Sequence, residues 1–137
     1  MPSIVTVPGR FDSQILARFR KNSGLDTKLR GIKKSAQREL GTVWLAAYLK
    51  EPDPVGICRL HLAPTHVAFL SELMVQPSYR CCGIGSALIR HTEAYCAMHL
   101  VERLALEYTA SSRRFYESLG YIQDPVFSTV VFKNFAR

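Results

Sequence analysis

The stretch Val75–Leu88 constrains this chain more than any other. It reads as the end of an apolar strand, a stop at Pro77, a short loop ending in Gly83-Ile84-Gly85, and the start of an amphipathic helix. Glycine allows a positive φ and a close approach of a ligand to the backbone. A loop that leads into a helix start also presents unpaired N–H groups and the positive end of the helix dipole. The pattern therefore indicates a phosphate or pyrophosphate site, although a lone Gly-x-Gly is also typical of a plain strand-to-helix turn.

Length and composition favour one globular domain. The chain has 137 residues, with 47% apolar and 21% charged residues, so we expect a single domain over residues 1–137. No apolar run approaches the length of a membrane span, and the first residues lack the pattern of a signal peptide. We therefore expect a cytoplasmic protein with no membrane partner and with its cysteines reduced.

The cysteines and histidines do not have metal-ligand spacing. Cys81 and Cys82 are adjacent, Cys58 and Cys96 stand alone, and the four histidines form no His-x-x-x-His pair. We expect no metal site. A helix start lowers the pKa of a nearby thiol, so Cys81 and Cys82 are either reactive thiols or two small residues that fill a tight loop.

Positive charge gathers in the first part of the chain. Residues 1–40 hold nine Lys or Arg against three Asp or Glu, whereas residues 41–137 hold nine against eight. This pattern fits a solvated helix face. It also fits a surface that attracts an anionic partner, namely the phosphates of a cofactor, an acidic acceptor or nucleic acid.

Hydrophobic periodicity predicts an alternation of helices and strands. We expect a helix capped by Asp12 or Ser13, a basic helix from Asp26 to about Leu40, and a long helix with His91 packed in its apolar stripe. Gly120 is expected to end a short last helix in a left-handed conformation. Strands are expected at 3–7, 42–49, 55–62, 66–75, 101–108 and 126–132, and helices at about 12–22, 26–40, 84–99 and 111–119.

Two segments resemble one known family. Arg80, Gly83 and Gly85 match the Arg/Gln-x-x-Gly-x-Gly/Ala pattern of the acetyl-CoA loop in GNAT-type N-acetyltransferases, and Phe115–Tyr121 is similar to that family's later Phe-Tyr-Glu-x-x-Gly-Phe segment. The resemblance covers roughly residues 67–122. It implies an α/β (α+β) fold with a mixed, mostly antiparallel sheet, splayed central parallel strands and flanking helices.

The resemblance also implies the position of acetyl-CoA, which serves as co-substrate. Backbone N–H groups of the loop would hold the pyrophosphate, with the Arg80 side chain as a further phosphate partner. The end of the preceding strand would bind the pantetheine arm, and one of its N–H groups would polarise the thioester oxygen. The residues implied as acetyl-CoA-binding are Leu73, Met74, Val75, Arg80, Cys81, Cys82, Gly83, Ile84, Gly85 and Ser86.

Three residues are candidates for proton transfer. Tyr116 occupies the position of the family's tyrosine, the usual proton donor to the CoA sulfur, although a core tyrosine is the plainer interpretation. Glu72 is expected to share a face with Leu70 and Met74, and apolar neighbours would raise the pKa of its carboxyl, as suits a base. Glu107, at the end of a later strand, lies where several members keep their base. Either carboxylate is also consistent with a solvated strand residue.

The sequence therefore favours an N-acetyltransferase that moves an acetyl group from acetyl-CoA to a primary amine by direct transfer in a ternary complex. The amine would belong to a small molecule or a protein, and the basic N-terminal part disfavours polycationic acceptors. Two alternatives are a CoA-binding module without catalysis and, less in keeping with the patterns, a basic nucleic-acid-binding protein. Pairing of two copies is compatible with the fold.

Overall fold

A computed structural model describes residues 2–23, 41–63 and 65–135 of the chain. The helices are α1 (Ser13–Ser23), the short 3₁₀ helix η2 (Pro77–Tyr79), α3 (Ile84–Met98) and α4 (Arg113–Ser118). The strands are β1 (Ser3–Pro8), β2 (Thr42–Tyr48), β3 (Gly56–Leu62), β4 (Val67–Val75), β5 (Arg103–Glu107), β6 (Ile122–Gln123) and β7 (Val130–Asn134). The expected basic helix from Asp26 lies outside the described residues.

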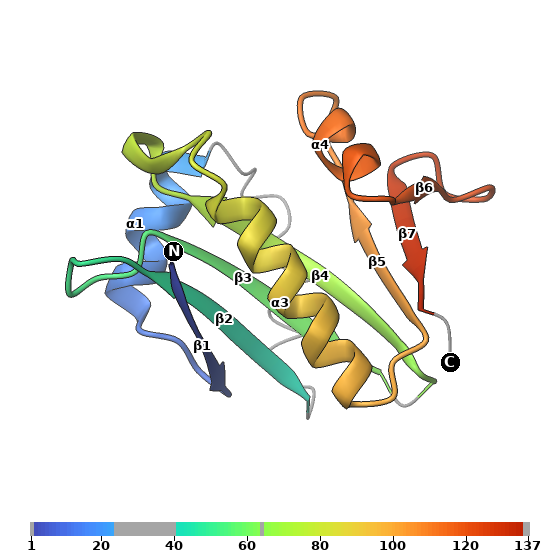
Figure 1. The fold of residues 1–137 in the computed structure, drawn as a ribbon, viewed down its shortest axis with the longest axis horizontal. Helices are drawn as coiled ribbons and strands as arrows, with labels where there is room; N and C mark the ends of the chain where they lie inside the picture. Colours follow the sequence, from blue (N-terminus) through green and yellow to red (C-terminus); the bar gives the residue numbers. More distant parts are fainter. Residues whose placement is uncertain (1, 24–40, 64, 136–137) are drawn as a thin grey trace.

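The strands form one mixed sheet in the order β1-β2-β3-β4-β5-β7-β6 (Figure 1). Within this sheet β4 and β5 run parallel, and the other neighbouring pairs are antiparallel. A parallel pair needs a long crossover connection, and here α3 supplies it. The expected fold class, a mostly antiparallel mixed sheet flanked by helices, is confirmed.

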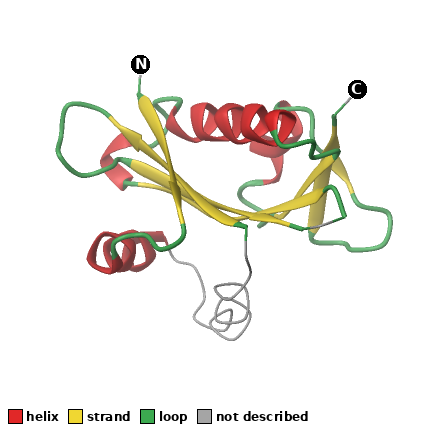
Figure 2. Cartoon of the chain, turned by 90° about the horizontal axis from the view of Figure 1, so that it is seen from below, coloured by secondary structure: helices red, strands yellow, loops and turns green. Residues whose placement is uncertain are grey.

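Helices cover both faces of the sheet, with α3 on one face and α1 on the other (Figure 2). On the α3 face, residues such as Leu45, Leu70 and Leu88 form the larger core, to which Tyr116 of α4 also belongs. On the α1 face, Leu16 and Phe19 pack against residues of β2, β3 and β4. The six buried residues that begin β2 follow from this double cover, as its apolar sequence predicts.

The two parallel strands separate partway along their length. The last paired residues of β4 and β5 are Leu70 and Leu106, although β4 continues to Val75. Figure 1 shows the two strands diverging from there, with the start of α3 beside the end of β4 and α4 beside the end of β5. The carboxyl end of β4 therefore has a backbone edge that β5 does not cover.

Two local expectations are wrong. The predicted strand 126–132 begins only at Val130, because Asp124 accepts the N–H groups of Val126 and Phe127 and turns the chain there. His91 is exposed on α3, since the buried stripe of the helix runs through Leu88, Thr92 and Cys96 instead. By contrast, Asp12 caps α1 as expected, through Oδ1 at 2.9 and 3.0 Å from the N–H groups of Gln14 and Ile15.

Among the described helices, none is both long enough and apolar enough to cross a membrane.

Candidate active site

The Gly-x-Gly loop, residues 80–86, forms a left-handed turn into α3. Cys81 has φ 63° and Gly83, the N-cap residue of α3, has φ 81°. Among the described residues, no hydrogen-bond acceptor meets the backbone N–H groups of residues 81–86, and the first helical bond runs from Ala87 to the Gly83 carbonyl. The first turn of α3 carries no acidic residue. A row of free N–H groups at the positive end of a 15-residue helix suits a polyanion.

Arg80 anchors the loop to its surroundings. Its Nε donates to the Val75 carbonyl at 3.2 Å, and its Nη2 donates to the Asn22 carbonyl at 3.0 Å. The guanidinium thus ties the end of β4 to the last turn of α1. The sequence assigns this side chain to a phosphate, whereas the structure gives two of its donors to the backbone.

Gly56 of β3 brings the start of α3 close to the sheet. A Cβ at this position would lie 2.7 Å from Cγ2 of Ile84 and 3.1 Å from Cδ1 of Leu88. Any larger residue would push the first turn of α3 away from β3. This close approach fixes the height of the Gly-x-Gly loop above the open edge of β4.

The two sequence motifs meet in space. A Cβ at Gly85 would lie 3.3 Å from Cζ of Phe115, which belongs to α4 and follows Gly85 by 30 positions. Because Gly85 has no side chain, the ring of Phe115 lies against the loop. This contact places the neighbouring Tyr116 on the same side of the separating strands as the loop.

Tyr116 is buried in the core of the α3 face. Its ring packs edge-on against Phe115 and Tyr121, with centroids 5.0 and 6.0 Å apart. Burial raises the pKa of the Tyr116 hydroxyl, and the nearby Cys58 thiol adds to this rise. A phenol that stays protonated is able to donate to a leaving group.

The open edge of β4 offers further N–H donors. Gln76 donates its N–H to the carbonyl of Val55, the residue before β3, at 2.9 Å. Successive N–H groups of a strand point to opposite edges, so those of Val75 and Leu73 face the side where β5 has separated. The segment Leu73-Met74-Val75 predicted to bind the pantetheine arm therefore lies along the gap between the strands.

Glu72 has surroundings other than those expected. It shares the α1 face with Met74 but not with Leu70, because a bulge in β4 at Glu72 (φ 54°) changes the alternation. Its carboxylate, 1% exposed, accepts bonds from Arg20 at 2.7 and 3.0 Å and lies 3.8 Å from Nη1 of Arg59. Two guanidinium groups at these distances favour the ionised carboxylate, whereas apolar neighbours would disfavour it.

Glu107 is exposed at the end of β5. Leu104 and Leu106 point into the core of the α3 face, so alternation turns Glu107 to the α1 face, the same face as Glu72. The two carboxylates predicted as candidate bases thus lie on one face, on the two strands that diverge.

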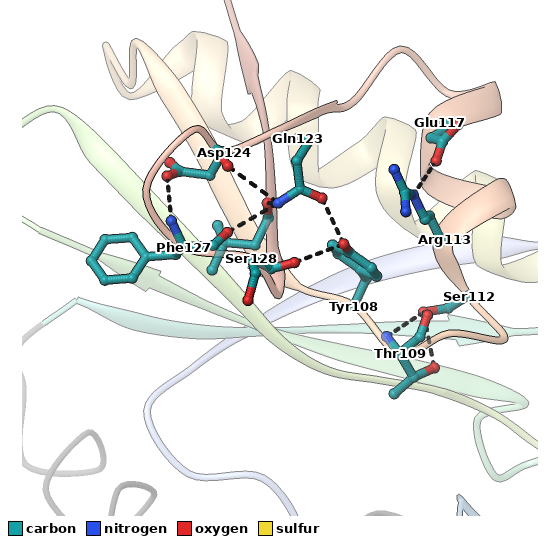
Figure 3. A network of polar contacts seen from close by, with 10 residues as sticks. Tyr108, Thr109, Ser112, Arg113, Glu117, Gln123, Asp124, Phe127 and Ser128 are labelled. Carbon is teal, nitrogen blue, oxygen red and sulfur yellow. Dashed lines mark hydrogen bonds and ion pairs between the residues drawn. The ribbon is translucent and has the colours of Figure 1, made fainter.

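The sequence analysis did not predict a network of polar contacts that begins at Tyr108, the residue after Glu107 (Figure 3). The Tyr108 hydroxyl lies 2.6 Å from Oε1 of Gln123 and 2.8 Å from the Ser128 carbonyl, and Nε2 of Gln123 donates to the carbonyls of residues 124, 127 and 130. The N–H groups of Phe127 and Val126 bond to Asp124 and lower the pKa of its carboxyl. Residues 124–129 thus form an ordered loop beside the exposed carboxylate. The Asp-Pro and Ser-Thr pairs that flank Val126-Phe127 were the available sequence signal.

The four cysteines are free thiols, two of them exposed and two buried. Cys81 and Cys82 are exposed on the loop, while Cys58 and Cys96 are buried in the core of the α3 face. Burial raises the pKa of both buried thiols to about 12. Within the described ranges, no three His, Cys, Asp or Glu side chains lie close enough to hold a metal ion.

Comparison with known families identifies a relationship over most of the chain. The model described as the acetyltransferase (GNAT) family matches residues 14–121, which include the Gly-x-Gly loop and Tyr116. A search of the curated proteins gives no match.

Solved structures share the fold at low sequence identity. A GNAT-family protein from Desulfovibrio desulfuricans has a TM-score of 0.79 and 16% identity, over 98% of this chain and 100% of its own. The PaiA N-acetyltransferase of Thermoplasma acidophilum, solved with coenzyme A, has a TM-score of 0.75 and 16% identity, over 97% and 99%. The ribosomal-protein-S18-alanine N-acetyltransferase of Escherichia coli has a TM-score of 0.72 and 19% identity, over 96% and 91%.

Proposed function

Because the chain belongs to the acetyltransferase (GNAT) family, we propose that it transfers an acetyl group from acetyl-CoA to a primary amine of a small molecule or a protein. Family membership indicates acyl transfer from coenzyme A. The identity of the acceptor and the mechanism described below are our proposal.

One observation carries the proposal. The six consecutive N–H groups of residues 81–86 have no acceptor among the described residues, and the same loop contacts the helix that holds Tyr116. The N–H groups suit the pyrophosphate, and the Leu73–Val75 edge suits the pantetheine arm that would run from the loop towards the gap. The thioester would then lie between the two separating strands, within reach of groups on both.

The reaction would proceed by direct attack of the amine on the thioester carbon. A carboxylate takes the ammonium proton, the nitrogen–carbon bond forms, and an N–H group of the β4 edge stabilises the developing oxyanion. The carbon–sulfur bond then breaks, the nitrogen releases its second proton to water, and the Tyr116 hydroxyl gives its proton to the thiolate and regains one from solvent. The raised pKa of Tyr116 keeps this proton available at neutral pH.

Of the two candidate bases, the geometry favours Glu107. Both oxygens of Glu72 accept bonds from Arg20, and its side chain is 1% exposed, so a substrate ammonium would have to displace an ion pair. Glu107 is exposed, and no hydrogen bond or ion pair engages its side chain among the described residues. We assign proton removal to Glu107, directly or through a water molecule.

The acceptor is expected to be neutral or anionic apart from its amine. Helix α1 carries exposed Arg18 and Lys21, and positive charge on this side disfavours a polycation. A useful panel contains spermidine, acidic amines and peptides with a free N-terminal alanine, since the Escherichia coli relative in fold acts on an alanine of a ribosomal protein. Preferential acetylation of spermidine would contradict this part of the proposal.

A thermal-shift titration tests the proposed function before an acceptor is known. Acetyl-CoA and CoA should each stabilise the protein, whereas ATP should not. At about 100 times Kd a single ligand adds about 2.7 kcal/mol, which raises Tm by several degrees in a domain of this size. Absence of a shift with acetyl-CoA would reject the proposal.

A further inference from the structure

The bulge in β4 is an unusual place for a glutamate. Arg59 of β3 pairs with Ser71, but Ile57 pairs with Met74, so Glu72 and Leu73 together face only Cys58. Glu72 has φ 54°, a left-handed conformation that costs energy in most residues with a Cβ. Such a conformation persists only where the surroundings hold it.

Within the described part of the chain, two other elements hold Glu72. Arg20 of α1 donates two hydrogen bonds to the carboxylate, from Nε to Oε1 at 2.7 Å and from Nη2 to Oε2 at 3.0 Å. Arg59 of β3 approaches the same Oε2 at 3.8 Å. Paired, bidentate bonds of this kind are both strong and directional. We call these three residues the Glu72 cluster.

Arg59 is itself fixed in place. Its side chain is 2% exposed, and its guanidinium lies 5.3 Å from the ring centroid of Trp44. Burial lowers the pKa of Arg59, and the negative charge of Glu72 opposes this change. The carboxylate of Glu72 thus carries the negative charge that pairs with two cations, the buried Arg59 of β3 and Arg20 of α1.

The bulge decides which backbone groups reach the gap between β4 and β5. Before it, Leu70 points into the core of the α3 face, and after it, Met74 points into the core of the α1 face. A shift of one residue in a strand exchanges the directions of all later groups. Without the extra residue, the N–H groups of Leu73 and Val75 would therefore point towards β3 rather than into the gap.

We propose that Glu72, held by Arg20 and Arg59, is a positioning residue that turns the N–H groups of the β4 edge towards the acetyl thioester. Arg20 acts on the reaction through Glu72, at a distance from the reacting atoms. The inference rests on the proposed acetyl transfer for its catalytic meaning, and it assigns to Glu72 a role other than that of a base.

Substitutions at Glu72 separate the two roles. Asparagine adopts a positive φ readily, whereas the similarly sized, β-branched valine does not, and neither can act as a base. We expect Glu72→Asn to keep at least about tenfold more kcat/KM than Glu72→Val, and the acidic side of the pH–rate profile to persist in Glu72→Asn. If Glu72 were the base, both variants would be equally inactive and that side of the profile would vanish.

Arg20 supplies a second test that does not alter the strand. Arg20→Gln should lower kcat/KM, with Arg20→Lys intermediate because lysine keeps the charge and loses the fork. Arg18→Gln is the matched control, since Arg18 lies on the same helix in an exposed ion pair with Asp53 at 3.1 Å. Equal effects of Arg20→Gln and Arg18→Gln would overturn the inference.

Two readouts do not depend on turnover. In the ligand-free protein, amide hydrogen exchange at Gln76 should quicken by about fivefold or more in Arg20→Gln and stay unchanged in Arg18→Gln. With acetyl-CoA labelled with ¹³C at the carbonyl carbon, the downfield shift of that signal on binding should shrink in Arg20→Gln. Unchanged hydrogen exchange at Gln76 in Arg20→Gln would overturn the inference, whether or not the protein binds acetyl-CoA. A failure to bind acetyl-CoA would reject the proposed function alone.

Discussion

The two sides of the gap between β4 and β5 are built in different ways. The side expected to hold the cofactor consists mainly of backbone groups, those of residues 80–86 and of the Leu73–Val75 edge, with α4 packed against Gly85. The side that faces α1 consists of side chains from α1, β3, β4 and β5, among them Arg20, Glu72 and Glu107. A site made of consecutive backbone groups has little scope for variation, whereas a site made of distant side chains changes with each of them.

The largest test of the cofactor side is Tyr116→Phe. Removal of the hydroxyl should lower kcat about 100-fold and leave the affinity for acetyl-CoA nearly unchanged, because the ring still packs on Phe115 and Tyr121. Steady-state release of CoA and a binding titration measure the two quantities. Since burial raises the pKa of Tyr116 above its usual value near 10, any loss of activity between pH 8 and 10 should persist in the variant.

Tyr121→Phe is the matched control. Its hydroxyl donates to Glu93 at 2.8 Å, so this variant also loses one buried phenol hydroxyl beside the same ring. It should be less stable than the parent but should keep kcat within a few fold. Equal losses of kcat in the two variants would show that packing, not proton donation, explains the effect.

The next test concerns the α1 face. Glu107→Gln should lower kcat/KM by about 10- to 100-fold at neutral pH and remove the acidic side of the pH–rate profile, because the amide cannot accept the ammonium proton. Glu117→Gln, an exposed glutamate paired with Arg113 at 2.6 Å, is the control and should have no such effect. If Glu107→Gln kept the pH–rate profile of the parent, another group would be the base. The side chains of the α1 face would then not include the base that we assign to them.

The sequence predicts the cofactor side far better than the α1 face, for a physical reason. Gly83 is needed for the positive φ of the turn and Gly85 for the close approach of Phe115, and both lie in one short motif whose spacing is visible in the chain itself. The pairing of Arg20 with Glu72 joins residues 52 positions apart, and no local pattern indicates it. The bulge also makes the position of Glu72 hard to predict. Strict alternation places Glu72 on the same face as Leu70, whereas the extra residue in β4 moves it to the other face. The strand predicted from Val126 is wrong for a related reason. The apolar side chains of Val126 and Phe127 favour a strand, but their N–H groups bond to Asp124, which turns the backbone.

A smaller effect is expected from the loop glycine Gly83. It has φ 81°, and a Cβ there would meet no atom within 4 Å, so Gly83→Ala introduces backbone strain without a clash. Strain of about 1 kcal/mol should raise the Kd for acetyl-CoA roughly fivefold if the loop relaxes in response. Gly9→Ala is the control, because Gly9 also has φ 81° with nothing within 4 Å but lies in the turn after β1. Gly9→Ala should lose similar stability and bind acetyl-CoA like the parent.

The smallest expected effect sharpens the comparison from within the loop. Cys81 has φ 63°, whereas Cys82 does not share this conformation, although both are exposed cysteines in the same turn. Cys81→Gly removes the strain of a Cβ in the left-handed region, and part of this gain is offset by the greater freedom of glycine in the unfolded chain. We expect the free energy of unfolding to rise by about 0.5 kcal/mol. Cys82→Gly removes no backbone strain, so it should lower the free energy of unfolding by a similar amount. Urea denaturation of the two variants measures both changes. If the two substitutions changed stability equally, the left-handed turn at Cys81 would carry no strain, and backbone conformation alone would not explain how this loop is held.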